Sequence, residues 1–102
     1  MNDIVSIAKK YLYKVNQAGI PVQSAYLFGS YARGGFREFS DIDICVVSKK
    51  FGKDYFREMI QLNNLRAGID ERIEAVPLAP DDLSDKYSTL VTEIRTHGIP
   101  LM

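Results

Sequence analysis

The chain has 102 residues, of which 46% are apolar, and its 13 lysine and arginine residues balance its 13 aspartate and glutamate residues. This length and apolar content predict a single domain, residues 1–102, with a small core, and they exclude a disordered segment. The balanced charge argues against a general binder of nucleic acid or of membrane surfaces, because such proteins usually carry a net positive charge.

The first half of the chain predicts a helix and two strands separated by a turn. Apolar residues recur at helical spacing near the N-terminus and stop at Gly19 and Pro21. A β-branched run before the midpoint is typical of a central strand. In chain order the expected elements are a helix over 4–18, a strand over 24–28, one helical turn over 31–33 and a strand over 41–47.

The second half predicts two helices and two strands. One helical register is formed by Phe56, Met59, Ile60 and Asn63, and a later apolar stripe includes Tyr87. The expected elements are a helix over 54–66, a strand over 71–76 closed by Pro77, a helix start at 80–83, a helix over 86–97 and an edge strand over 99–102. This order predicts an α/β protein in which helices cover a small sheet.

The single cysteine, Cys45, lies inside an apolar run and is expected to be a small core residue. One cysteine allows no disulfide within the chain and no cysteine-based zinc site, which is typical of a reducing compartment. The N-terminus lacks the pattern of a signal peptide, and no apolar run approaches the ~20 residues of a membrane span. We therefore expect a soluble cytoplasmic protein with no membrane partner.

Two acids, Asp41 and Asp43, stand at the entrance of the predicted central strand. Residues two apart on a strand face the same way, so both carboxylates should lie on one face. Oxygen ligands suit Mg²⁺ or Mn²⁺, and the only histidine, His97, is distant in the sequence. The simpler alternative is that both acids cap the strand and face solvent.

A glycine-serine turn, Gly29-Ser30, precedes this acidic pair by ten residues. It follows a predicted strand and opens a short helical turn, where backbone N–H groups can hold phosphate oxygens. The pair is also ordinary turn chemistry, and no Gly-Lys-Ser/Thr follows as in a Walker A loop. Turn and acids together indicate a site for a nucleoside triphosphate with its metal.

The spacing Gly29-Ser30, ten residues, then Asp41-Ile42-Asp43 resembles the signature of the DNA polymerase β-like nucleotidyltransferases. The stretch GSYARGGFREFSDIDICVV is similar to their minimal, single-domain branch, which is often the antitoxin partner of a helical HEPN-domain protein. The resemblance implies the nucleotidyltransferase fold, a small mixed sheet of three or four strands with packed helices.

This resemblance also implies a third carboxylate on a neighbouring strand, for which Asp70, Glu71 and Glu74 are the candidates. Glu74 lies in mid-strand, where a charged side chain most requires a functional explanation. Asp70 and Glu71 lie near the strand entrance and are interpreted as solvated turn acids. We choose Glu74, which departs from the aspartate that the family more commonly has there.

Several polar side chains are candidates for contacts with the nucleotide. Arg33 belongs to the family motif, Ser30 is placed to contact terminal phosphates, and Ser40 immediately precedes the acidic pair. Arg37 and Arg72 could also neutralise triphosphate charge, although a surface or ion-paired role is the simpler interpretation for both.

The implied reaction is nucleotidyl transfer, with ATP as the expected substrate and Mg²⁺ or Mn²⁺ held by Asp41, Asp43 and Glu74. Two hypotheses follow. The first is an enzyme that transfers AMP to a hydroxyl of a HEPN-type toxin. The second is a non-catalytic antitoxin of the same fold that neutralises its partner by occlusion. The intact acidic pair favours the enzyme, because a pure binding module has no need for it.

Overall fold

The computed structural model describes residues 2–37 and 39–102, and a four-stranded mixed sheet lies at its centre. The elements in chain order are α1 (Asn2–Gln17), β1 (Ser24–Phe28), α2 (Ser30–Arg33), β2 (Ile42–Val47), α3 (Tyr55–Asn64), β3 (Ile73–Leu78), the 3₁₀ helix η1 (Pro80–Ser84), α4 (Thr89–His97) and β4 (Ile99–Pro100). The predicted α/β class and the small mixed sheet of three or four strands are confirmed, and the sheet has four strands.

The strand order is β3-β2-β1-β4, so β2 is an inner strand, as its β-branched sequence predicted. β1 runs antiparallel to both β2 and β4. β2 and β3 are parallel, and α3 forms the crossover that a parallel pair requires. This topology brings the start of β2 beside the start of β3 and beside the end of β1.

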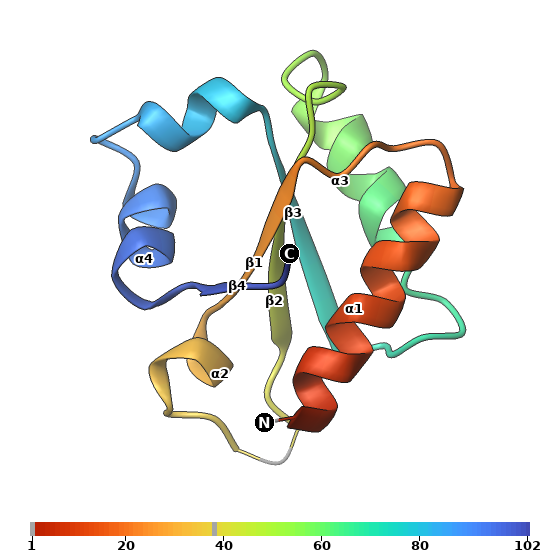
Figure 1. The fold of residues 1–102 in the computed structure, drawn as a ribbon, viewed down its shortest axis with the longest axis vertical. Helices are drawn as coiled ribbons and strands as arrows, with labels where there is room; N and C mark the ends of the chain where they lie inside the picture. The colour runs from red at the N-terminus through yellow and green to blue at the C-terminus, as the bar shows by residue number, and fades with distance from the viewer. Residues whose placement is uncertain (1, 38) are drawn as a thin grey trace.

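Helices cover the two faces of the sheet unequally (Figure 1). α1 and α3 lie on one face, where Ile42, Ile44 and Val46 of β2 join the larger core. The Tyr11 hydroxyl donates a hydrogen bond of 2.6 Å to the Leu62 carbonyl and ties these two helices together. The other face packs against α4 in a smaller core that contains residues such as Cys45, Val47, Val91 and Ile94.

The outer edge of β3 is covered by side chains of α3 and of the turn that follows it. The Asn63 amide donates to the Ala75 carbonyl and accepts from the Ala75 N–H, both at 2.9 Å. Arg66 donates to the Ile73 carbonyl at 2.9 Å. Pro77, which we expected to close the strand, lies inside it. An edge strand tolerates proline because no ladder partner needs that N–H.

The last helix is shorter than expected, because Ser88 begins it. The Ser88 hydroxyl accepts a hydrogen bond of 3.2 Å from the Val91 N–H, and α4 starts at Thr89. Tyr87 therefore lies outside the helix with 86% of its surface exposed, whereas Val91 and Ile94 are buried as the stripe predicted.

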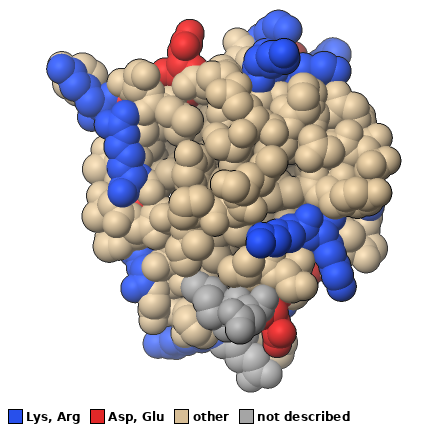
Figure 2. All heavy atoms as spheres, in the orientation of Figure 1, with Lys and Arg blue, Asp and Glu red and all other residues tan. Residues whose placement is uncertain are grey.

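On the face drawn in Figure 2, charged side chains lie in separate groups. In the view of Figure 2, lysine and arginine side chains lie around the margin of a largely uncharged face. Within the described residues, no helix has the length and apolar character needed to cross a membrane.

Candidate functional site

A row of residues that spans three strands defines the candidate site. Phe28 on β1 lies opposite Asp43 on β2, and Asp43 lies opposite Glu74 on β3. Neighbouring strands are about 4.8 Å apart, so the two acids project side by side from adjacent strands. Gly29 follows Phe28 directly, so the glycine-serine turn adjoins the same row. The structure thus brings the turn, the aspartates and the chosen third acid to one end of the sheet.

The Asp43 carboxylate is packed against the backbone of Gly29. A Cβ atom added at Gly29 would lie 2.0 Å from Asp43 Oδ2, well inside contact distance. Gly29 also has φ of 75° and ψ of −154°, a region that is essentially restricted to glycine. Both observations explain why residue 29 is glycine. This glycine lets β1 turn sharply into α2 beside the carboxylate.

Electrostatic repulsion is concentrated on Asp43. Partial burial, followed by the nearby charges of Glu74, Asp41 and Glu93, raises the pKa of Asp43 from 3.8 to about 6, while Arg33 opposes the change. Asp41, immediately before β2, and Glu74 on the edge strand are both exposed. Three site acids from three segments therefore act on one half-buried carboxylate.

The chemistry of this donor set fits a hard divalent cation. The donors are carboxylate oxygens, and a cation would offset both the burial and the repulsion that raise the pKa of Asp43. As they stand, no three Asp, Glu, His or Cys side chains within the described residues are close enough together to hold a metal ion. The acids converge on the same end of the sheet but are not assembled into a finished coordination shell.

The turn after β1 presents the start of α2 to this carboxylate cluster. Gly29 is the N-cap, and its carbonyl accepts hydrogen bonds from the N–H groups of Ala32 and Arg33, at 3.1 and 3.0 Å. The first N–H groups of a helix have no partner within that helix and are free to bind another acceptor. Ser30, the first helical residue, is half-buried at this position.

Glu93 is a site residue that the sequence did not indicate. Its Oε1 accepts a hydrogen bond from Arg33 Nη1, so an ion pair links α2 to α4 above Asp43. No motif contains Glu93, and its position on a helix surface gives no local signal, because only the tertiary packing of α4 brings it here.

The remaining candidates lie around the site or away from it. Ser40 is held within its loop, where its hydroxyl accepts a hydrogen bond of 2.7 Å from the Arg37 N–H. Arg72 is ion-paired with Asp70 at 2.8 Å, as the simpler interpretation held. Asp70 is not the solvated turn acid that we expected. Only 16% of its side chain is exposed, and hydrogen bonds to Arg72 lower its pKa.

The fold and this site define a class of protein. A family model described as "Nucleotidyltransferase domain" matches residues 8–96, and the chain therefore belongs to the nucleotidyltransferase domain family. A relative from Methanocaldococcus jannaschii, named "Putative protein adenylyltransferase", is 35% identical over 88 residues, which cover 79% of this chain. The chain spans 58% of the length of that curated relative.

Solved structures show the same fold. A structure described as a putative nucleotidyltransferase from Sulfolobus solfataricus superposes with a TM-score of 0.69 at 22% identity, covering 96% of this chain and 78% of that one. A structure described as a toxin-antitoxin with AMP-PNP has a TM-score of 0.65 at 28% identity, with coverages of 91% and 71%. The expected nucleotidyltransferase fold is confirmed, and the chain is similar to a chain of a toxin-antitoxin structure.

Proposed function

We propose that this chain transfers AMP from ATP to a hydroxyl side chain of a partner protein, and that the partner is a HEPN-type toxin. The observation that carries the proposal is the row across β1, β2 and β3, which aligns the glycine-serine turn with Asp43 and Glu74. The relative named as a protein adenylyltransferase supports AMP and a protein acceptor. The toxin-antitoxin neighbour with AMP-PNP supports an adenine nucleotide and a toxin partner.

Asp41, Asp43 and Glu74 would hold divalent metal, expected to be Mg²⁺ or Mn²⁺. When bound, the metal supplies positive charge against the triphosphate and lowers the pKa of an attacking hydroxyl. Gly29 and Ser30 would bind phosphate oxygens through backbone N–H groups and the Ser30 hydroxyl. Arg33 would exchange part of its contact with Glu93 for a phosphate, and Ser40 would hold the loop beside the acids.

The chemical step is an in-line displacement at the α-phosphorus. The acceptor hydroxyl loses its proton, its oxygen bonds to the α-phosphorus, and the bond to the β-phosphate oxygen breaks to release pyrophosphate. Glu74, exposed on the edge strand, is the carboxylate best placed to take that proton from an approaching acceptor. The other residues position the nucleotide and neutralise its charge. Positioning and charge neutralisation supply most of the rate enhancement in phosphoryl transfer.

The proposal is tested by intact mass. The purified chain is incubated with Mg²⁺, ATP and a HEPN-type protein from the same organism as the proposed partner. We expect the partner to gain one AMP moiety, and we expect Asp41→Ala/Asp43→Ala to abolish the gain while leaving the fold intact by circular dichroism. Glu74→Gln should reduce transfer if Glu74 is the third acid.

Two results would count against this proposal in different ways. A tight complex without any mass change would favour the occlusion module. Equal transfer by the wild type and the double aspartate variant would remove the acidic pair from the reaction.

A further inference from the structure

The parts of the candidate site follow one another in order across the sheet, from β1 through β2 to β3. The glycine-serine turn adjoins β1, Asp43 stands on β2, and Glu74 stands on the edge strand β3. If the proposed function holds, the triphosphate occupies the β1 end of this row. In-line displacement requires the acceptor to approach from the side opposite the leaving pyrophosphate. The acceptor must therefore arrive over β3.

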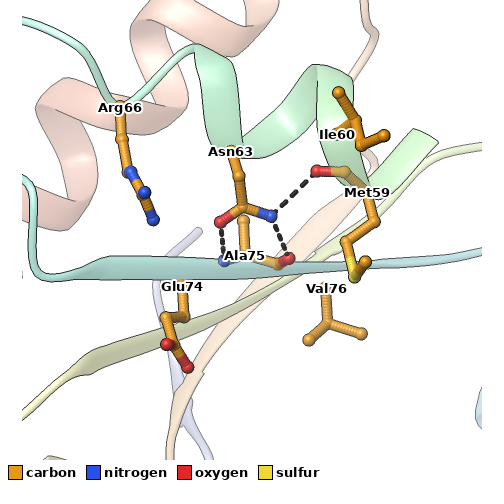
Figure 3. Close-up of a pocket in the computed structure, with 7 residues that line it drawn as sticks. All are labelled: Met59, Ile60, Asn63, Arg66, Glu74, Ala75 and Val76. Atoms are coloured by element: carbon orange, nitrogen blue, oxygen red, sulfur yellow. Dashed lines mark hydrogen bonds between the residues drawn. The ribbon is translucent and has the colours of Figure 1, made fainter. Parts of the chain in front are cut away.

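A groove lies at that end of the row. It has a volume of about 390 Å³ and runs between α3 and β3, where Met59, Ile60, Asn63, Arg66, Glu74 and Val76 line it. Figure 3 shows the α3 side chains on one side of β3, with Glu74 and Val76 projecting from its other side. The groove therefore wraps around the sheet edge and reaches the third acid of the candidate site.

Apolar side chains dominate the approach to this groove. Along α3, Phe56 is 65% exposed and Ile60 is 43% exposed, and Met59 lies half-buried between them. These residues share the helical register seen in the sequence, yet their stripe faces solvent, while Leu62 is buried in the core. A stripe of large exposed apolar residues on one helix is typical of an interaction surface.

The polar side chains on the α3 side of the groove, Asn63 and Arg66, are already engaged. Asn63 is bonded to Ala75 and to the Met59 carbonyl, and Arg66 is bonded to the Ile73 carbonyl and lies 3.5 Å from Glu71. A partner strand cannot add to β3, because these side chains occupy its backbone groups. An occupant must therefore bind through apolar side chains.

The charge of the groove favours a protein over a nucleic acid. Its two charged lining residues, Arg66 and Glu74, balance each other. Nucleic-acid binding depends on cations that neutralise phosphates, and Arg66 is the sole cation among the lining residues. The surface instead matches a protein segment that carries apolar residues.

We propose that the α3–β3 groove, lined by Met59, Ile60 and Val76 and extended along α3 by the exposed Phe56, docks the acceptor protein and delivers its hydroxyl to Glu74. Apolar residues that flank the acceptor hydroxyl pack on the groove, while the nucleotide lies at the opposite end of the row. This inference rests on the proposed function and adds the surface by which the partner is chosen.

In the test, the protein, Mg²⁺ and ATP radiolabelled on its α-phosphate are added to an extract of the source organism. The measurement is the amount of label transferred to a product. The variant is Phe56→Asp/Ile60→Asp, and the control is Tyr13→Asp, which replaces an exposed apolar residue by one aspartate at a 68% exposed position on α1. We expect the wild type and Tyr13→Asp to label a protease-sensitive, nuclease-resistant product. The double variant should lose labelling by about tenfold or more, while its affinity for ATP with Mg²⁺ stays within about twofold.

Ile60→Leu guards against a folding defect, because it keeps the apolar contact and should retain labelling. Undiminished labelling by the double variant would overturn the docking surface and leave the proposed function standing. Nuclease-sensitive label would overturn the choice of a protein occupant. If the wild type transfers no label at all, the proposed function fails and the docking surface fails with it.

Discussion

At the scale of single residues, Asp43 combines burial with like-charged neighbours, and both raise its pKa to about 6. Because the folded state then binds this proton more tightly than the unfolded chain does, ionising Asp43 disfavours folding. The loss of folding stability that this ionisation causes is absent at pH values below about 4. It grows as the pH rises to about 6 and is complete above that. The metal-free site is thus a source of instability at neutral pH.

We predict that Asp43→Asn stabilises the metal-free protein at pH 7.5 by about 1 kcal/mol, a figure reduced for the partial solvent exposure of the side chain. The gain should shrink as the pH falls from about 6 to about 4, where the wild-type carboxyl is protonated as well. Urea unfolding in EDTA across this range provides the measurement. A variant less stable than the wild type at pH 7.5 would show that Asp43 makes a favourable contact instead.

Gly29 and Gly34 form a matched pair for a second prediction. Both have positive φ, 75° and 88°, but a Cβ at Gly29 would strike Asp43, whereas nothing lies within 4 Å of one at Gly34. Gly29→Ala should lower the free energy of unfolding by about 1–3 kcal/mol and weaken ATP binding by about tenfold or more. Gly34→Ala should carry only the milder strain of the left-handed region, because Gly34 has φ of 88° and ψ of 2°, and it should bind ATP normally.

Calorimetric titration of ATP with Mg²⁺ into both variants compares a Cβ placed against Asp43 with a Cβ placed in open space. Equal binding by Gly29→Ala and Gly34→Ala would mean that the position of the Asp43 carboxylate does not matter to the nucleotide.

At the scale of elements, sequence patterns predicted the features that depend on residues close together in the chain. The order of helices and strands followed from apolar periodicity. Gly29-Ser30 with Asp41 and Asp43 indicated the candidate site, because turn residues and strand alternation are local signals. The contact of Glu93 with Arg33 joins residues 60 apart and depends on how α4 packs, so no pattern announced it.

Element boundaries deviated where tertiary contacts override local preference. Pro77 was expected to close β3, but the strand continues through it because it forms an edge. The α3 stripe of Phe56 and Ile60 has the period of a buried face, yet it is exposed. Periodicity identifies a helix without saying which side meets the core.

The cover over the β3 edge supports a prediction of its own. Asn63→Ala removes both hydrogen bonds to Ala75 and should lower the free energy of unfolding by about 1–2 kcal/mol. The neighbouring, exposed Asn64→Ala is the control, because it makes the same change in helix propensity on the same helix. Urea unfolding should find Asn64→Ala neutral or stabilising. If the two variants are equally stable, water replaces the Asn63 amide without any loss in the free energy of unfolding.

At the scale of the whole molecule, the candidate site lies where several elements meet. β1, β2 and β3 supply its row, and the Arg33–Glu93 ion pair connects α2 to α4. A ligand bound across these elements contacts several of them, so unfolding any one of them also loses the binding free energy. Ligand binding should therefore raise the stability of the entire chain and not of one segment.

We predict that ATP with Mg²⁺ at a hundredfold excess over its Kd stabilises the protein by about 2.7 kcal/mol, which corresponds to a rise in Tm of roughly 10 °C or more for a chain of this size. The physical reason is that the acids repel one another in the free protein, and a metal-bound triphosphate replaces that repulsion with attraction. ATP in EDTA should produce little of this shift. Asp41→Asn/Asp43→Asn should lose it even with Mg²⁺, although its own metal-free Tm should equal or exceed that of the wild type. Differential scanning calorimetry of both proteins, with and without Mg²⁺, gives all four values. The same Tm rise in EDTA, or in the double variant, would mean that the nucleotide binds elsewhere on the molecule.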